Sequence, residues 1–273
     1  MAQDDRPTTP NDRMLMVLEY LSGAKQAPVR QADMARDCGI SPATLSRIIN
    51  VLSEWGYVLR TNKNQVIGNF RFQRNVRMSE SYQLFLNTMI TEIGAQHNLV
   101  VEVIVNAGND LFWQSSTAPS NRSFSLRAQP GFRRGLMELD VLSRLYLARL
   151  SGEQLRSLFD RVNFSTTGVH MKLLSEPEAL EVIEAARPKL VDWDFDGNRQ
   201  GIRRFATYIT DPEGNFAHLL SLAEPATPTR DRSAHEAEIS EILNVARTRL
   251  MQEMGRKSSS PPGRGNVEER FAG

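Results

Sequence analysis

The sequence predicts an α+β protein with two domains, and three observations support this expectation. A length of 273 residues gives room for about two domains of ordinary size. Apolar residues recur at helical spacing in the first part of the chain, whereas strand-like runs, turns and helices mix after residue 96. A composition of 40% hydrophobic and 24% charged residues is typical of a globular protein that buries a core in each domain.

Two helices and a tight turn are expected near the start of the chain. The first helix covers about residues 11 to 23, because Asn11 is a good cap and apolar side chains follow at steps of three and four. The second covers about residues 29 to 38. Gly39 then stands where a chain that leaves a helix favours positive φ, a conformation that glycine adopts without strain.

A third helix is expected directly after this turn. Ser41 is placed as its N-cap and Pro42 in its first position, and the periodic pattern continues to Trp55. One side of this helix is apolar and carries Leu45, Ile48, Ile49, Leu52 and Trp55. A helix, a glycine-containing turn and a second helix are typical of the motif that places its second helix in the major groove of DNA.

The other side of the third helix carries candidate DNA-reading side chains, which are Ala43, Thr44, Ser46, Arg47 and Asn50. Arg47 is the strongest candidate, because a guanidinium can donate two hydrogen bonds to guanine, and Asn50 suits adenine. Ala43 or Thr44 suits a thymine methyl group, and Ser41 suits a phosphate at the helix start. The alternative is a helix used for protein contact, with Arg47 merely solvated.

A short hairpin follows and completes a winged helix-turn-helix domain over residues 11–68. Strand-like residues 57–59 and 65–67 flank a turn-prone segment. We expect Arg60 and Lys63 in this wing to hold the DNA backbone or to enter the minor groove.

The charge is unevenly distributed along the chain. Nine basic and three acidic residues lie between Lys25 and Arg77, which gives this segment +6. Since the whole chain carries +1, the remainder carries −5. A basic head favours attraction to the phosphates of double-stranded DNA, and a structural adaptor would not need it.

Residues 69–95 are expected to link the two domains and to contain a strongly amphipathic helix. Ser79 opens this helix, and Gly94 is expected to end it. Its apolar stripe consists of Tyr82, Phe85, Leu86, Met89, Ile90 and Ile93. The stripe is expected either to pair two protomers as a dimerisation helix or to pack on its own domain.

The second domain is expected over residues 96–252 as a mixture of strands and helices. Strands are predicted near residues 99–105, 111–115, 123–127, 202–210 and 216–223, and helices near 139–150, after Ser151, from Ser175 to 189 and over 232–251. Residues 1–10 and the Ser/Pro/Gly-rich residues 253–273 are expected to be disordered.

Two segments of the second domain resemble the IclR-type transcriptional regulators. Residues 131–150 read GFRRGLMELDVLSRLYLARL, similar to the family pattern GRRLPLHATALGKALLA. Residues 201–225 read GIRRFATYITDPEGNFAHLLSLAEP, similar to GVRCVAAPVFDxxGxVVAALSVSGP. The resemblance implies a bacterial, cytoplasmic regulator with a winged helix-turn-helix, a linker helix and a GAF-like effector-binding domain. It also implies a homodimer or tetramer on a palindromic operator.

The resemblance locates an effector pocket, for which the candidate residues are Trp113, Met137, Glu138, Asp140, Trp193, Arg204 and Ser221. Glu138 and Asp140 stand where the family has His and Thr, and Arg204 stands where it has Cys. One hypothesis is that Arg204 clamps the carboxylate of a small organic acid, with Ser221 and a tryptophan ring completing the site. Its rival is that Glu138 or Asp140 neutralises Arg204 and that the pocket is closed, with no ligand.

Several other functions are not expected. The four histidines show no HExxH spacing, and the chain has neither a GxSxG elbow nor a phosphate-binding glycine loop, so we expect no enzyme, metal site or cofactor. The single cysteine, Cys38, agrees with a reducing compartment and is expected to be a core residue. The polar N-terminus and the absence of a long apolar run indicate a cytoplasmic protein without a signal peptide or membrane segment.

Overall fold

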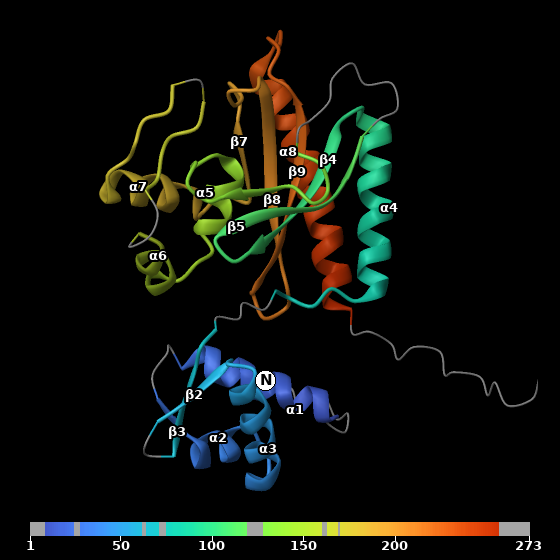
Figure 1. Ribbon diagram of the computed structural model, residues 1–273. Helices are drawn as coiled ribbons and strands as arrows, with labels where there is room; N and C mark the ends of the chain where they lie inside the picture. Colours follow the sequence, from blue (N-terminus) through green and yellow to red (C-terminus); the bar gives the residue numbers. More distant parts are fainter. Residues whose placement is uncertain are drawn as a thin grey trace, which may run out of the picture. The chain divides into compact units, whose positions relative to one another are not determined.

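The structure is a computed structural model that describes residues 9–24, 28–61, 64–70, 75–118, 128–159, 163–168 and 170–256. The chain divides into two units at Arg74 and Asn75, here called the head and the body (Figure 1). The predicted linker segment is therefore split, because residues from 75 onward belong to the body.

The head is a winged helix-turn-helix. Its elements are α1 (Pro10–Gly23), β1 (Val29–Arg30), α2 (Gln31–Asp37), α3 (Pro42–Glu54), β2 (Val58–Arg60) and β3 (Gln65–Gly68). The three strands form an antiparallel sheet in the order β1-β3-β2. The predicted start of the second helix is wrong, because Val29 pairs with Val66 of β3 and the helix begins only after Arg30.

Capping fixes the other helix boundaries in the head. Thr9 caps α1 one position before its first residue, in a capping box with Asp12. Gly39 has a φ of +63°, which confirms the predicted turn between α2 and α3. The side chain of Ser41 accepts a hydrogen bond from the Thr44 amide, which confirms its predicted role as the N-cap of α3.

The core of the head lies where its three helices meet its sheet, and it consists of Val17, Leu18, Leu21, Met34, Ala35, Ile40, Leu45, Ile48, Ile49, Leu52, Val58 and Val66. Cys38 packs against this core, as predicted. Trp55 does not, because 76% of it is exposed. The helix ends at Glu54, so Trp55 lies at the C-cap, where the helical periodicity no longer directs its side chain onto the apolar face.

The body is built on a six-stranded antiparallel sheet in the order β6-β5-β4-β9-β8-β7. Its strands are β4 (Val100–Ala107), β5 (Asp110–Thr117), β6 (Arg133–Gly135), β7 (Val191–Asp194), β8 (Ile202–Thr210) and β9 (Phe216–Pro225). Four of these were predicted, whereas β6 and β7 were not. The predicted strand near residues 123–127 lies outside the described residues.

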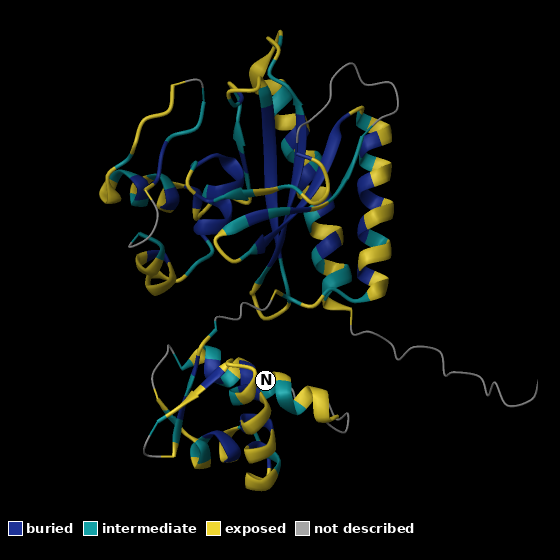
Figure 2. Cartoon of the chain, viewed as in Figure 1, coloured by how far each residue is buried: buried dark blue, intermediate teal, exposed yellow. Residues whose placement is uncertain are grey.

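Helices cover both faces of this sheet (Figure 1). The long helices α4 (Glu80–His97) and α8 (Arg232–Gly255) pack on one face. The other face holds α5 (Val141–Leu147), α6 (Gly152–Phe159) and α7 (Glu176–Ala186). In Figure 2 the central strands are buried, and the exposed residues of α4 lie on its outer side. The fold is α+β, as predicted.

The apolar stripe of α4 packs on its own domain. Tyr82, Leu86, Met89 and Ile90 are buried in one cluster with residues of α8 and the sheet. Of the two expectations for this stripe, packing on its own domain is the one that the structure shows, and a part of α4 in dimerisation stays a prediction. Gly94 does not end the helix either. A Cβ at Gly94 would lie 3.2 Å from the Thr117 side chain and 3.3 Å from the Leu99 carbonyl, so the glycine allows close packing of helix and sheet.

Candidate functional site

The exposed face of α3 is the first candidate site. Ala43, Ser46, Arg47 and Asn50 are exposed and Thr44 is half-buried, while Leu45, Ile48, Ile49 and Leu52 are buried on the opposite side. The structure thus places all five predicted DNA-reading side chains at or beside one accessible surface. Their contacts with bases remain predictions.

Two of the predicted DNA contacts have partners within the head. The Ser41 hydroxyl, expected on a phosphate, accepts from the Thr44 amide at 3.3 Å and donates to the Thr44 hydroxyl at 2.9 Å. Arg60 was expected to contact DNA from the wing. It lies in wing strand β2, and its guanidinium donates to Asn50 Oδ1 and, at 3.3 Å, to Ser53 Oγ of α3. The amide nitrogen of Asn50 is left as the group that can donate to a base. Lys63 lies outside the described residues.

The second candidate site is a cavity of about 420 Å³ in the body. Its wall comes from β5, β6 and β8, from the segment that leads into α5, from the segment between α6 and α7, and from the β7–β8 loop. The lining residues are Trp113, Ala128, Phe132, Arg134, Gly135, Met137, Glu138, Asn163, Ser165, Met171, Leu173, Asn198, Arg199, Gln200, Ile202 and Arg204. This size and largely apolar wall suit a small organic molecule.

Arg204 lines the cavity as predicted, but its charge is already matched. Its Nε donates to Glu102 Oε2 at 2.8 Å and its Nη2 donates to Glu102 Oε1 at 3.1 Å. Burial opposes the charge on Arg204, yet Glu102 keeps its pKa above the ordinary value. Neutralisation within the chain was one of the two expectations, but the ion-pair partner is Glu102 and not Glu138 or Asp140, although Asp140 also favours the charge on Arg204. The structure has a cavity here and not the closed pocket that this expectation included.

Glu102 is the residue that the sequence reasoning missed. It lies in the middle of β4 and has no exposed surface. Besides Arg204 it accepts hydrogen bonds from Trp113 Nε1 at 3.0 Å and from Ser221 Oγ at 3.2 Å. The sequence signal that could have identified it is an acid inside the apolar run of residues 100–105. A carboxylate buried in such a strand requires a polar partner.

Of the seven predicted effector residues, four line the cavity and three do not. Trp113, Met137, Glu138 and Arg204 contribute to its wall. Ser221 is fully buried against Glu102, and Asp140 is held by Arg134. Trp193 belongs to the opposite side of the sheet, where it packs against Phe205 and donates to Glu236 at 3.0 Å.

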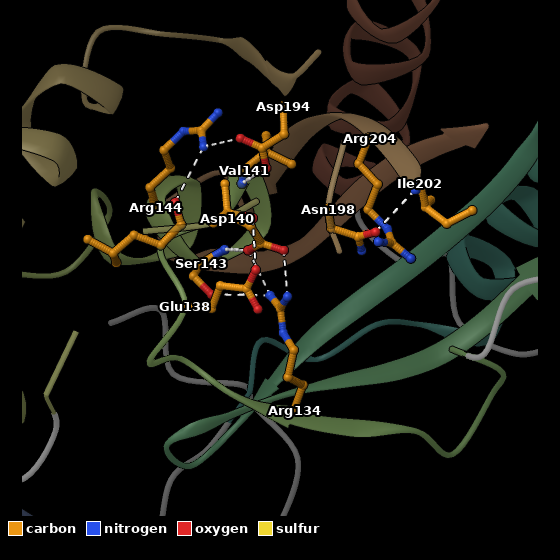
Figure 3. Close-up of polar contacts among 12 residues, drawn as sticks. Arg134, Glu138, Asp140, Val141, Ser143, Arg144, Asp194, Asn198, Ile202 and Arg204 are labelled. Carbon is orange, nitrogen blue, oxygen red and sulfur yellow. Dashed lines mark hydrogen bonds and ion pairs between the residues drawn. The ribbon is translucent and has the colours of Figure 1, made fainter. Parts of the chain in front are cut away.

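Two carboxylates, one buried on Asp140 and one half-buried on Asp194, occupy the N-terminus of α5 (Figure 3). Asp140 is the N-cap and accepts from the Ser143 amide at 3.0 Å, while Asp194 accepts from the Val141 amide at 2.6 Å. Arg134 binds Asp140 through both terminal nitrogens, at 2.6 and 2.7 Å. Burial opposes the charge on Asp140 and favours a higher pKa, but Arg134 outweighs burial and lowers the pKa. This carboxyl group therefore stays ionised at neutral pH.

Arg144 extends this network from α5 to the sheet. It donates to Asp192 and Asp194, both at 2.5 Å, and so ties α5 to β7. Burial, and then the neighbouring Asp140, raise the pKa of Asp194 against the effect of Arg144.

The described residues contain no group of three or more His, Cys, Asp or Glu side chains able to hold a metal ion. Among the same residues, no helix is long and apolar enough to cross a membrane.

Comparison with known proteins agrees with this architecture. The family model of the IclR helix-turn-helix domain matches residues 12–61. The structure of an IclR transcriptional regulator from Alicyclobacillus acidocaldarius is similar with a TM-score of 0.54 at 13% identity, over 92% of this chain and 100% of that one. The structure of IclR from Thermotoga maritima gives 0.53 at 16% identity, over 90% and 98% of the two chains.

The body by itself is similar to the inducer-binding domain of the PobR transcription factor from Acinetobacter. That domain was solved as a double mutant with 3-hydroxybenzoic acid. Its TM-score is 0.54 at 12% identity, over 62% of this chain and 96% of that domain. At such identities the likeness shows the fold. None of the curated protein sequences matches the chain.

A winged helix-turn-helix head with a polar, exposed face on α3, followed by an antiparallel-sheet body, defines a DNA-binding regulator of transcription. Residues 12–61 match the IclR helix-turn-helix domain, and the chain as a whole has the fold of the solved IclR regulators.

Proposed function

We propose that α3 reads a specific operator and that Arg47 is its main reader. The exposure of Arg47 on the polar face of α3, opposite the buried apolar residues, carries this proposal. A guanidinium in this position can donate two hydrogen bonds to the O6 and N7 atoms of guanine, which discriminates by about 1 to 3 kcal/mol. Asn50, held by Arg60, can donate to a neighbouring base through its amide nitrogen.

Replacement of Arg47 by alanine tests the base contact. We expect Arg47→Ala to lose preference for the operator over random DNA at fixed salt, by about 10- to 100-fold. Arg36→Ala is the matched control, because Arg36 is also exposed but is held by Asp33 and Asp37 on α2. We expect this control to keep the preference. Equal weakening of Arg47→Ala on both DNAs would identify a phosphate contact and contradict the proposal.

We further propose that a homodimer or a tetramer presents two heads to a palindromic operator. Helix-turn-helix proteins commonly use two heads on half-sites about one turn of DNA apart. Since the α4 stripe is buried within the body, another surface has to join the protomers. Light scattering of the free protein and of its operator complex gives the number of chains, and a single chain per operator would contradict this proposal.

We also propose that a small organic effector occupies the cavity and changes operator binding. The cavity of about 420 Å³ supports this, as does the likeness in fold to the PobR inducer-binding domain solved with an aromatic acid. A regulator that binds DNA is expected in the bacterial cytoplasm, where such metabolites also occur.

A thermal-shift screen with small aromatic and aliphatic compounds tests the effector. A compound that raises Tm is expected to change the operator Kd at least fivefold, which is an ordinary coupling between two sites. Compounds that raise Tm but leave operator binding unchanged would contradict control by this cavity. Absence of salt-dependent DNA binding in a gel shift would instead favour an adaptor over a regulator.

A further inference from the structure

The charges in the effector cavity indicate which class of molecule it selects. We propose that the cavity takes an aromatic compound that carries a hydrogen-bond donor and no negative charge, and that Glu138 binds this donor. This inference rests on the proposed effector site and specifies its ligand. The basis is the set of hydrogen bonds and ion pairs that the charged side chains in and behind the cavity wall already make.

The charge of Arg204 is already matched, so it offers an incoming carboxylate no unpaired cation. Both of its hydrogen-bonding contacts go to Glu102, at 2.8 and 3.1 Å, and Glu102 has no exposed surface. A ligand carboxylate at this guanidinium would either displace Glu102, which leaves its charge buried without a cation, or place a second negative charge close to it. Such an exchange is strongly unfavourable, because a buried charge without a partner has lost its hydration.

Arg134 and the N-terminus of α5 are also occupied. Arg134 binds Asp140 through both terminal nitrogens and contacts Ser143 Oγ at 3.3 Å. The amide of Val141 donates to Asp194 and that of Ser143 donates to Asp140. The chain therefore supplies its own carboxylates to the guanidinium and helix amides that would otherwise attract an anion.

Arg199 and Glu138 are the other charged residues of the described wall. Arg199 is exposed, and an ion pair at an exposed cation gains little over hydration. Glu138 is half-buried and accepts a hydrogen bond from Thr167 Oγ1 at 2.8 Å, but no ion pair within 4.0 Å is found for it among the described residues. In Figure 3 Glu138 lies beside Arg134, whose two terminal nitrogens donate to Asp140. Glu138 is thus the wall carboxylate that can accept a ligand donor.

The remaining wall favours an aromatic ring. Trp113 and Phe132 stand edge to face, with their ring centroids 5.2 Å apart, and Ile202 adds an apolar surface. Met137 and Met171 are also part of the wall, and flexible thioethers adapt to flat ligands. Apart from Glu138 and the three arginines, the polar side chains of the wall are neutral and suit uncharged ligands: Asn163, Ser165, Asn198 and Gln200.

Matched compounds that differ only in the charged group test this inference. Calorimetry would compare the amidine, the amide and the carboxylate of one ring, with phenyl, naphthyl and indolyl rings as three series. For any ring that binds, we expect the amidine or the amide to bind at least tenfold more tightly than the carboxylate. A carboxylate that binds most tightly would overturn the inference and leave the proposed effector site intact.

A charge-neutral variant assigns the selection to Glu138. Glu138→Gln keeps an oxygen for Thr167 and removes the charge, so we expect it to reduce the preference for the amidine over the carboxylate at least tenfold. Glu176→Gln is the control, since it makes the same charge change on an exposed residue outside the cavity wall. An unchanged preference in Glu138→Gln would overturn the assignment. Absence of binding in all three series would count against both this inference and the effector site.

Discussion

At the scale of single residues, Glu102 organises the interior of the body. It lies on β4 opposite Ser221 of β9, and it receives hydrogen bonds from three other side chains. Arg204, which the family resemblance placed in the pocket, lines the cavity. Its partner was not predictable, because the register that brings residue 102 beside residue 204 joins strands far apart in the sequence.

Removal of the Glu102 charge is expected to destabilise the body. Glu102→Gln leaves the Arg204 guanidinium, in a residue that is 8% exposed, without its counterion. Loss of one partner of a buried pair costs about 3 to 5 kcal/mol in the free energy of unfolding, measured by urea denaturation. The double variant with Arg204→Met should recover part of this loss. A loss below about 1 kcal/mol in Glu102→Gln would contradict the pairing.

His218 gives the stability a defined pH dependence. It is fully buried and its Nε2 lies 2.7 Å from Tyr82 Oη, which joins α4 to β9. Burial lowers the pKa of His218 from 6.5 to about 4. Because the unfolded chain binds the proton more tightly, the contribution of His218 is complete above pH 6.5 and is lost as the pH falls towards 4, by about 3 kcal/mol.

Comparison with His218→Gln isolates this contribution. Glutamine is neutral at every pH, so the difference in unfolding free energy between wild type and variant should shrink as the pH falls from 7 to 4. Denaturation curves at several pH values measure it. Parallel pH profiles for the two proteins would show that His218 does not titrate as described.

At the scale of elements, capping residues predicted helix starts better than apolar patterns predicted helix lengths. Ser41 and Ser175 cap α3 and α7 as expected. The predicted helix over residues 139–150 is shorter in the structure, because Asp140 caps it and moves its start to Val141. The strands β6 and β7 were missed because they are short: Arg133–Gly135 has three residues and no apolar side chain, and Val191–Asp194 alternates over only four residues. Both are ordered by pairing at the sheet edges.

Asp140 allows the cap of α5 to be separated from its ion pair. Asparagine is also a good N-cap, so Asp140→Asn removes the charge opposite Arg134 but keeps the cap, whereas Asp140→Ala removes both. We expect both variants to be destabilised, with Asp140→Ala about 1 kcal/mol less stable than Asp140→Asn by urea denaturation. Equal stability of the two variants would show that the cap contributes nothing.

At the scale of the whole molecule, positive charge is concentrated in the part of the chain that contains the helix-turn-helix. The segment from Lys25 to Arg77 carries +6 and overlaps the head, while the rest of the chain carries −5. The sequence was enough to predict the helix-turn-helix, since local signals at Gly39 and Ser41 specify it. The candidate effector cavity was predicted only in part, because its polar partners come from strands that meet only in the folded body.

Selection from a pool of random double-stranded DNA tests the central claim most directly. The full chain would be incubated with the pool at about 0.15 M salt, and the retained fragments would be sequenced. A head that reads bases through α3 predicts strong enrichment of one common sequence among these fragments. Retained fragments with the same base composition and sequence as the starting pool would contradict a sequence-specific regulator.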